Sequence, residues 1–172
     1  MSDLQKLLLL LFLKSAPQEL TYSKPLTVRV AIVYFFSGYI VLQSTLTPDG
    51  IFAGLILGFF VQLAFVYIVL QALGRQPRFL QTIYAIFGVG VLFNVISWPV
   101  FSVMSDMSAD DALKSSMSLV FLMLVSWEVL VKAYIFKHAL EMKMVSALAL
   151  SFSLFFISVA LSQLLFPAEA VG

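Results

Sequence analysis

The chain has 172 residues, of which 62% are hydrophobic and only 11% are charged. A soluble domain is roughly half apolar and about a quarter charged, so this composition predicts an integral membrane protein. A formal net charge of +1 offers no basic surface to nucleic acid, and the absence of cysteine excludes disulfides, thiolate metal sites and cysteine nucleophiles. With one histidine, His138, a hydrolytic triad or a multi-histidine metal site is hard to build.

The amino-terminal region, residues 1–25, contains the apolar run Leu7–Leu13 between Lys6 and Lys14. This run is too short to cross the bilayer, which takes about 20 apolar residues. A cleavable signal peptide is the competing interpretation, but an acidic residue weakens its basic start and a proline follows the small residues where cleavage would occur. We expect a short interfacial helix instead, with its leucines inward and both lysines on lipid phosphates.

Five apolar segments follow, each about long enough to span a membrane. They are Leu26–Leu46, Ile51–Leu73, Phe79–Met104, Met117–Phe136 and Met142–Phe166. The third contains Trp98-Pro99 and either stops at Ser97 or continues as a kinked helix. Proline, glycine and clustered charges separate the segments, as expected where a chain leaves the hydrocarbon. The sequence therefore predicts an all-α integral membrane protein, with five transmembrane helices over residues 26–166 and an external tail of residues 167–172.

Lysine and arginine are unequally distributed between the two sides of this predicted bundle. One side carries the amino-terminal region and the second and fourth loops, with Lys6, Lys14, Lys24, Arg75, Arg78, Lys137 and Lys143. The loops and tail of the opposite side carry only Lys114. The positive-inside rule therefore predicts a cytoplasmic amino terminus and an external carboxyl terminus. We expect contact with the bilayer, including its anionic lipids, at Lys6, Lys14, Arg75 and Arg78.

Glu128 lies about halfway along the fourth segment, where a carboxylate costs roughly 2.5 kcal/mol or more on insertion scales. Lys132 follows on the same helical face. One interpretation is a proton-titrating carboxylate or a polar substrate site, because a buried carboxyl can stay protonated near neutral pH. The other is a structural ion pair, with Lys132 extending toward the cytoplasmic surface. The ion pair is the simpler interpretation, since one pair without further acids makes a poor proton relay.

Three more polar residues lie within the predicted spans. Arg29 is one turn into the first segment, and we expect its side chain to reach the headgroups. A pair with Glu128 and a bound anionic lipid are the alternatives for Arg29. Gln62 and Asn94 lie deeper, where amides commonly form hydrogen bonds between helices. We expect these two amides to serve packing rather than ligand binding.

Glycines mark two of the predicted helices. Gly54 and Gly58 form a Gly-x-x-x-Gly ridge on the second segment. Gly88 and Gly90 similarly reduce the side-chain bulk of the third. Small residues let helix backbones approach closely in a membrane, so the glycines predict helix packing within one chain or between copies.

Motifs of several enzyme classes are missing. The sequence has no Gly-rich phosphate loop, no Gly-x-Ser-x-Gly nucleophile turn and no His-Glu-x-x-His metal helix. We therefore predict a protein that is not an enzyme, with no catalytic, cofactor-binding or metal-binding residues.

The segment Phe79–Gly88 resembles the start of the third span in the Yip family of Ypt/Rab-interacting membrane proteins, in particular its short bacterial members. Ser126-Trp127 and Lys137–Leu140 are similar to the ends of that family's fourth span. The acidic Asp-Leu-Tyr-Gly-Pro type motif of eukaryotic members is absent, and Ala16–Leu20 does not replace it, so Rab binding is not implied. The resemblance implies a non-enzymatic protein of a bacterial inner membrane, concerned with membrane organisation or protein assembly.

Two functional hypotheses follow. The first is a scaffold or accessory subunit with a membrane-protein partner or a second copy of itself. The second is a small proton-coupled transporter or permeation element that uses Glu128. The lack of an internal repeat argues against the usual transporter plan, although a homodimer would supply the symmetry. A dry carboxylate paired with lysine favours the scaffold, and an open polar cavity at Glu128 favours transport.

The predicted topology has a direct test, because the chain contains no cysteine. Single cysteines at Gln76 and Ser108 should react with an impermeant thiol reagent from opposite sides, Gln76→Cys from the cytoplasm and Ser108→Cys from outside. Labelling of both variants from the same side would contradict the five-span topology.

Overall fold

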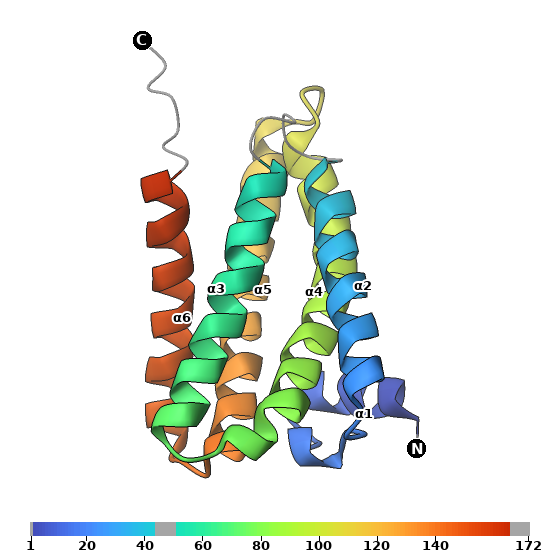
Figure 1. The fold of residues 1–172 in the computed structure, drawn as a ribbon. Coiled ribbons are helices and arrows are strands. Elements are labelled where there is room, and N and C mark those ends of the chain that lie inside the picture. The colour runs from blue at the N-terminus through green and yellow to red at the C-terminus, as the bar shows by residue number, and fades with distance from the viewer. Residues whose placement is uncertain (1, 44–50, 166–172) are drawn as a thin grey trace.

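The computed structural model describes residues 2–43 and 51–165, and these are helical apart from short turns. The long helices are α2 (Lys24–Gln43), α3 (Ile51–Ala72), α4 (Phe79–Ser105), α5 (Asp111–Leu140) and α6 (Met144–Leu165), shown in Figure 1. The five candidate spans are these helices, with α4 extended back through the 3-10 turn η2 (Gln76–Arg78), and all are long and apolar enough to cross a membrane. The predicted all-α class with five spans is confirmed.

Several predicted boundaries shift. Helix α5 begins at Asp111 rather than Met117 and ends at Leu140 rather than Phe136, because a helix does not have to stop where its side chains become polar. Helix α4 runs through Pro99 to Ser105, so the alternative end at Ser97 is wrong. The predicted ends of the first and fifth segments and the tail of residues 167–172 lie outside the described residues.

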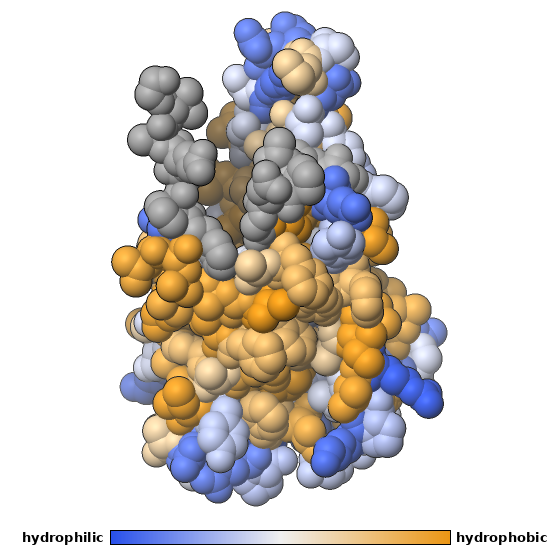
Figure 2. All heavy atoms as spheres, turned by 45° about the horizontal axis from the view of Figure 1, so that its top comes forward, coloured by the Kyte–Doolittle hydropathy of each residue, from blue (hydrophilic) through white to orange (hydrophobic). Residues whose placement is uncertain are grey.

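The outer surface of the bundle is suited to lipid. On the face shown in Figure 2 a broad hydrophobic region covers the middle of the molecule, and hydrophilic residues gather toward its two ends. Large apolar side chains of the long helices lie on the surface; Phe60 of α3 and Phe156 of α6 are each 62% exposed. In water this much apolar surface is unfavourable, whereas in a bilayer it meets hydrocarbon. The helices therefore contact the bilayer directly.

The amino-terminal helix α1 (Asp3–Leu11) packs against the bundle and does not lie apart on the membrane surface. A capping box starts it, since the Ser2 hydroxyl accepts from the Gln5 backbone and the Gln5 side chain accepts from the Ser2 backbone. Leu7, Leu10 and Leu11 are buried in the protein core. The predicted inward face of leucines thus meets other helices of the same chain.

Lys6 is also held by protein rather than by a lipid phosphate. Its ammonium group donates to the Glu19 carbonyl at 2.6 Å and lies 3.6 Å from a carboxylate oxygen of Asp3. Lys14 is exposed. Of the two predicted lipid-binding lysines, only Lys14 keeps its side chain available to the surroundings.

Helix α4 is the centre of the bundle, with 56% of its most apolar stretch buried. A Cβ atom built on Gly88 would lie 2.7 Å from Leu7 of α1, and one built on Gly90 would lie 2.5 Å from the ring of Tyr34 on α2. Both distances are shorter than packed carbon atoms allow. The two glycines therefore let α1 and α2 approach α4 closely, in the way that small residues act in membrane helices.

The two ends of the bundle are packed differently. The closed end carries α1, the 3-10 turn η1 (Pro17–Glu19) and Arg78, whereas the open end carries the turn Asp106–Asp110. Buried residues gather toward the closed end, where every residue of 82–90 is buried. None of the α5 residues 111–128 is buried. The core of the protein thus occupies one half of the bundle.

Two arginines link the connection between α3 and α4 to the end of α5 at the closed end. Arg75 and Arg78, from the connection between α3 and α4, both form ion pairs with Glu141. Arg78 also donates to the carbonyls of His138 and Ala139 at 3.2 and 3.0 Å, which satisfies acceptors in the last turn of α5. Hydrogen bonding from Arg78, together with the two nearby positive charges, lowers the pKa of Glu141. The predicted lipid-contacting arginines therefore have protein partners.

The glycine contacts predict different outcomes for two matched substitutions. Gly90→Ala places a methyl group against the Tyr34 ring, which is itself stacked on Phe87 at 4.8 Å, and overpacking of this kind typically costs about 1 to 3 kcal/mol. Gly54→Ala meets no atom within 4 Å. We expect Gly90→Ala to lower the thermal unfolding midpoint in detergent and Gly54→Ala to leave it unchanged or slightly raised. Equal midpoints would contradict the tight contact at Gly90.

Candidate functional site

The charged residues of the fourth predicted span form an ion pair. The ammonium nitrogen of Lys132 lies 2.7 Å from a carboxylate oxygen of Glu128, one helical turn apart on α5. The Lys132 and Glu128 side chains are 15% and 30% exposed. Lys132 also donates to the side-chain oxygen of Gln62 on α3 at 3.3 Å. Its side chain therefore spans the space between α5 and α3, and does not extend to the membrane surface as the ion-pair interpretation expected.

Gln62 makes a hydrogen bond between helices of the kind that the sequence predicts, because its side chain on α3 accepts from Lys132 on α5. Gln62 is 6% exposed, and its side-chain oxygen accepts from the charged Lys132 rather than from a neutral group. Its side-chain nitrogen is buried without a hydrogen-bond partner in the part of the chain that the structure describes. A buried donor without an acceptor typically costs about 1 to 3 kcal/mol of folding stability. The Gln62 nitrogen is therefore a destabilising feature beside the charged pair.

A cavity with two adjoining lobes lies next to this pair, and we refer to it as the Glu128 cavity. The first lobe, of about 620 Å³, lies mainly among α2, α3, α4 and α5, and the second, of about 560 Å³, mainly among α3, α5 and α6. Both lobes are lined by Tyr34, Gly54, Gly58, Val125, Glu128 and Ser162. From Glu128 the lining extends to Phe101 and Phe121, toward the open end. The carboxylate thus faces space rather than a packed core.

Several polar side chains line the cavity besides the charged pair: Tyr34, Gln62, Asn94, Ser97, Ser151, Ser158, Ser162 and Gln163. Asn94 lines the first lobe and donates to the Ser37 hydroxyl at 2.8 Å, so it ties α4 to α2 as a packing amide does. Ser151 lines the second lobe and donates to the Val129 carbonyl at 2.7 Å, which ties α6 to α5. Aromatic and aliphatic side chains make up most of the other lining, including Phe35, Phe59, Phe93, Leu55 and Leu124. The site therefore combines one charged pair with a largely apolar first lobe and a more polar second lobe.

The ridge of Gly54 and Gly58 lines both lobes. A Cβ atom on either glycine would meet nothing within 4 Å, so neither makes the close helix contact that the ridge predicts. The same residue type that brings helices together at Gly88 leaves room at Gly54. The width of the cavity depends on this lack of side chains on α3.

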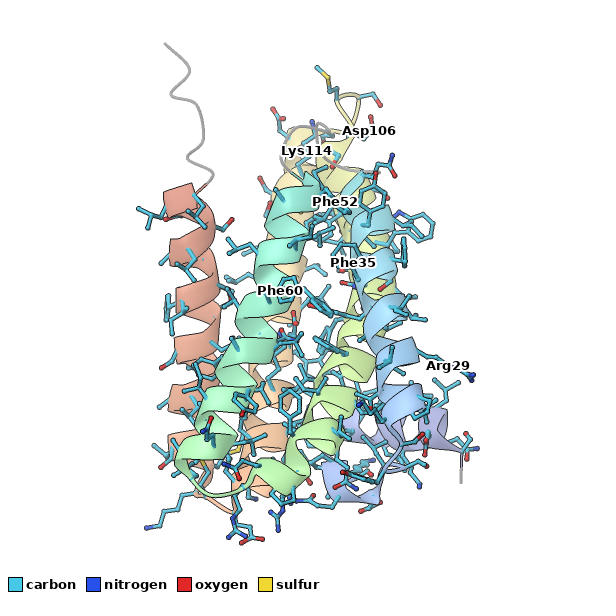
Figure 3. The ribbon with its side chains drawn as sticks, in the orientation of Figure 1. Arg29, Phe35, Phe52, Phe60, Asp106 and Lys114 are labelled. Carbon is cyan, nitrogen blue, oxygen red and sulfur yellow. The ribbon has the colours of Figure 1, made fainter. Side chains whose placement is uncertain are left out.

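Arg29 is separate from the site. It is exposed on α2, and Figure 3 shows its side chain pointing away from the bundle. Glu128 already has Lys132 as its ion-pair partner, so the alternative pair of Arg29 with Glu128 is wrong. The outward direction agrees with a side chain that reaches headgroups.

The sequence analysis assigned no contact at the site to two aromatic residues near it. Tyr34 lines both lobes, but it lies within an apolar run and nothing in the sequence distinguishes it. Trp127 precedes Glu128, and its indole nitrogen donates to the Leu11 carbonyl of α1 at 3.1 Å. A tryptophan in the middle of a span, away from the interfaces where this residue is usually enriched, was a usable signal for an internal contact.

No protein-family model, curated protein or solved structure matches this chain. Among residues 2–43 and 51–165, no group of three histidine, cysteine, aspartate or glutamate side chains is placed to hold a metal ion. The Yip resemblance therefore stays a prediction, and the charged pair and its cavity are the features from which a function is inferred.

The pair predicts a specific pattern of stabilities. Glu128→Gln and Lys132→Met each leave one charge without its partner, and we expect each to lower stability by somewhat less than the roughly 3 to 5 kcal/mol of a fully buried pair, because both groups are partly exposed. The double variant should recover part of the loss. Thermal unfolding of all four proteins in detergent measures the coupling, and simple addition of the two losses would show that the charges are independent.

Proposed function

We propose that this chain is a non-enzymatic membrane protein that binds a small ligand at Glu128 and Lys132, as the ligand site of a small transporter or permeation element. The observation that carries the proposal is that the charged pair lines a cavity instead of lying in a packed core. Ionisable residues within membrane spans are costly, and where they face a cavity they commonly mark the path of a substrate or ion.

The uneven packing of the bundle supports access from one side. The closed end is filled by buried side chains such as Phe87 and Phe136, whereas the cavity lining extends from Glu128 toward the open end. A site that is sealed on one side and reachable from the other suits a protein that exposes its ligand to one side at a time. With the closed end cytoplasmic, as the distribution of lysine and arginine predicts, the ligand enters from the outer side of a bacterial inner membrane.

The scaffold or accessory subunit is the second candidate, and one observation favours it. The ridge of Gly54 and Gly58 has open space beside it, and small residues are the usual contact points for another membrane helix. In this alternative a partner protein or a second copy inserts a side chain or helix beside α3, and the charged pair is structural. A role as scaffold or accessory subunit is also what the Yip resemblance implies.

Cysteine accessibility tests the ligand site. Ser97→Cys places a thiol in the wall of the Glu128 cavity, and Ser153→Cys places one on the exposed, lipid-facing side of α6. An impermeant thiol reagent needs water to reach a thiolate, so we expect Ser97→Cys to react from the outer side and Ser153→Cys to remain unlabelled. Protection of both thiols would contradict a ligand path and favour the scaffold.

A further inference from the structure

We propose that the ligand of the Glu128 cavity is a zwitterion, a molecule with an ammonium group and an oxyanion, and that it binds by replacing the contact between Glu128 and Lys132. This inference rests on the proposed ligand site and adds the chemical class of what the site accepts. It follows from the charge balance of the pair, from the unused hydrogen-bonding groups around it and from the apolar wall of the first lobe.

Charge balance is the first argument. Glu128 and Lys132 compensate each other at 2.7 Å within a membrane-spanning helix. An anion that bound Lys132 alone would draw it from Glu128, and a cation that bound Glu128 alone would leave Lys132 without a partner. Either case leaves a charge uncompensated in a low-dielectric setting, which is strongly unfavourable. A zwitterion brings both missing partners, so both protein charges remain compensated while the ligand is bound.

The hydrogen-bonding groups match the same ligand. Lys132 has three N–H donors, and its described contacts are with the Glu128 carboxylate and the Gln62 oxygen. The Gln62 nitrogen is a buried donor that lacks an acceptor among the described residues. An oxyanion placed between Lys132 and Gln62 would accept from both. The ammonium group of the same ligand would then donate to Glu128, which lines both lobes.

The part of the ligand that lies in the first lobe is apolar, because Phe35, Phe59 and Phe93 line that lobe. Phe35 and Phe59 also line a third cavity of about 470 Å³ between α2, α3 and α4, whose other lining is apolar except for Thr27. Figure 3 shows Phe35 at the α2 and α3 side of the bundle. The two spaces adjoin there, because Phe35 and Phe59 line both. The zwitterion therefore has two sources: a free amino acid with an apolar side chain, or a phosphoethanolamine lipid whose acyl chain enters beside Phe35.

Thermal unfolding of the full chain in a non-ionic detergent tests the class of ligand. The probes are leucine, its methyl ester and 4-methylpentanoate, which share one apolar group and carry both charges, only the positive charge or only the negative charge. Lysophosphatidylethanolamine and lysophosphatidylglycerol form the lipid pair. Near a hundredfold excess over its dissociation constant, a ligand raises the midpoint of a chain of this size by roughly 5 to 10 °C. We expect this shift only with a zwitterion.

The pattern of shifts decides both the class and the source. A shift with leucine identifies a soluble ligand, a shift with lysophosphatidylethanolamine identifies a lipid, and either supports the proposal. Equal shifts with a singly charged analogue would overturn the zwitterion class while leaving the ligand site intact. Absence of a shift with every probe would also overturn it, and labelling of Ser97→Cys then shows whether the ligand site itself fails.

Substitutions at Glu128 and Lys132 test whether the ligand binds at the charged pair. The double variant Glu128→Gln with Lys132→Met keeps the cavity and has no lone charge, and we expect it to lose the ligand-dependent shift. Ser126→Ala is the matched control, because Ser126 is exposed on α5 and its hydroxyl donates to the Leu122 carbonyl of its own helix. The control should keep the shift. A shift retained by the double variant would overturn the assignment of the ligand to Glu128 and Lys132.

Discussion

The close approach of α1 and α2 to the glycine face of α4 determines how the whole bundle is arranged. Gly88 admits Leu7, and Gly90 admits the ring of Tyr34, which stacks on Phe87. In hydrocarbon there is no hydrophobic force between helices, so tight van der Waals packing must hold them together. That packing is concentrated at the closed end. Toward the open end the helices meet less closely, and the cavity occupies the space between them.

The charged pair lies at the boundary between these two regions. Val129 is buried, whereas no α5 residue from Asp111 to Glu128 is. Glu128 thus faces the cavity, and Lys132 lies one turn nearer the packed end, where it reaches Gln62. Of the two charges the lysine is the less exposed, so its desolvation costs more, and its interaction with Glu128 offsets part of that cost. This order places the carboxylate nearer the open end than the ammonium group.

Sequence reasoning succeeded where the physics depends on one segment at a time. Five spanning helices were predictable because the number of consecutive apolar residues in each segment can be compared directly with the thickness of the hydrocarbon core. The pairing of Glu128 with Lys132 was predictable because one helical turn separates them. The contact of Lys132 with Gln62 was not, since it joins residues 70 apart in the sequence. Only the assembled bundle determines which amide lies beside the ammonium group.

The glycines show the same limit more sharply. Gly54 and Gly88 are both small residues within apolar helices, and the sequence predicts close packing at each. Gly88 packs against Leu7, whereas Gly54 lines the Glu128 cavity. The difference depends on which neighbour faces each glycine, and periodicity carries no such information. The docking of α1 escaped prediction for a related reason, because an apolar run of its length fits a lipid surface and a protein groove equally well.

The position of α1 has a consequence for how the chain is assembled in the cell. Its partners come late in the sequence, since Asp3 accepts from Tyr84, 81 residues onward, and Leu11 accepts from Trp127, 116 residues onward. Synthesis proceeds from the amino terminus, so α1 leaves the ribosome long before α4 and α5 exist. During that interval the contacts of its leucines with later helices, such as that of Leu7 with Gly88, cannot form. Helix α1 is therefore made well before its partners, and its docking completes the closed end only after the fourth span has inserted.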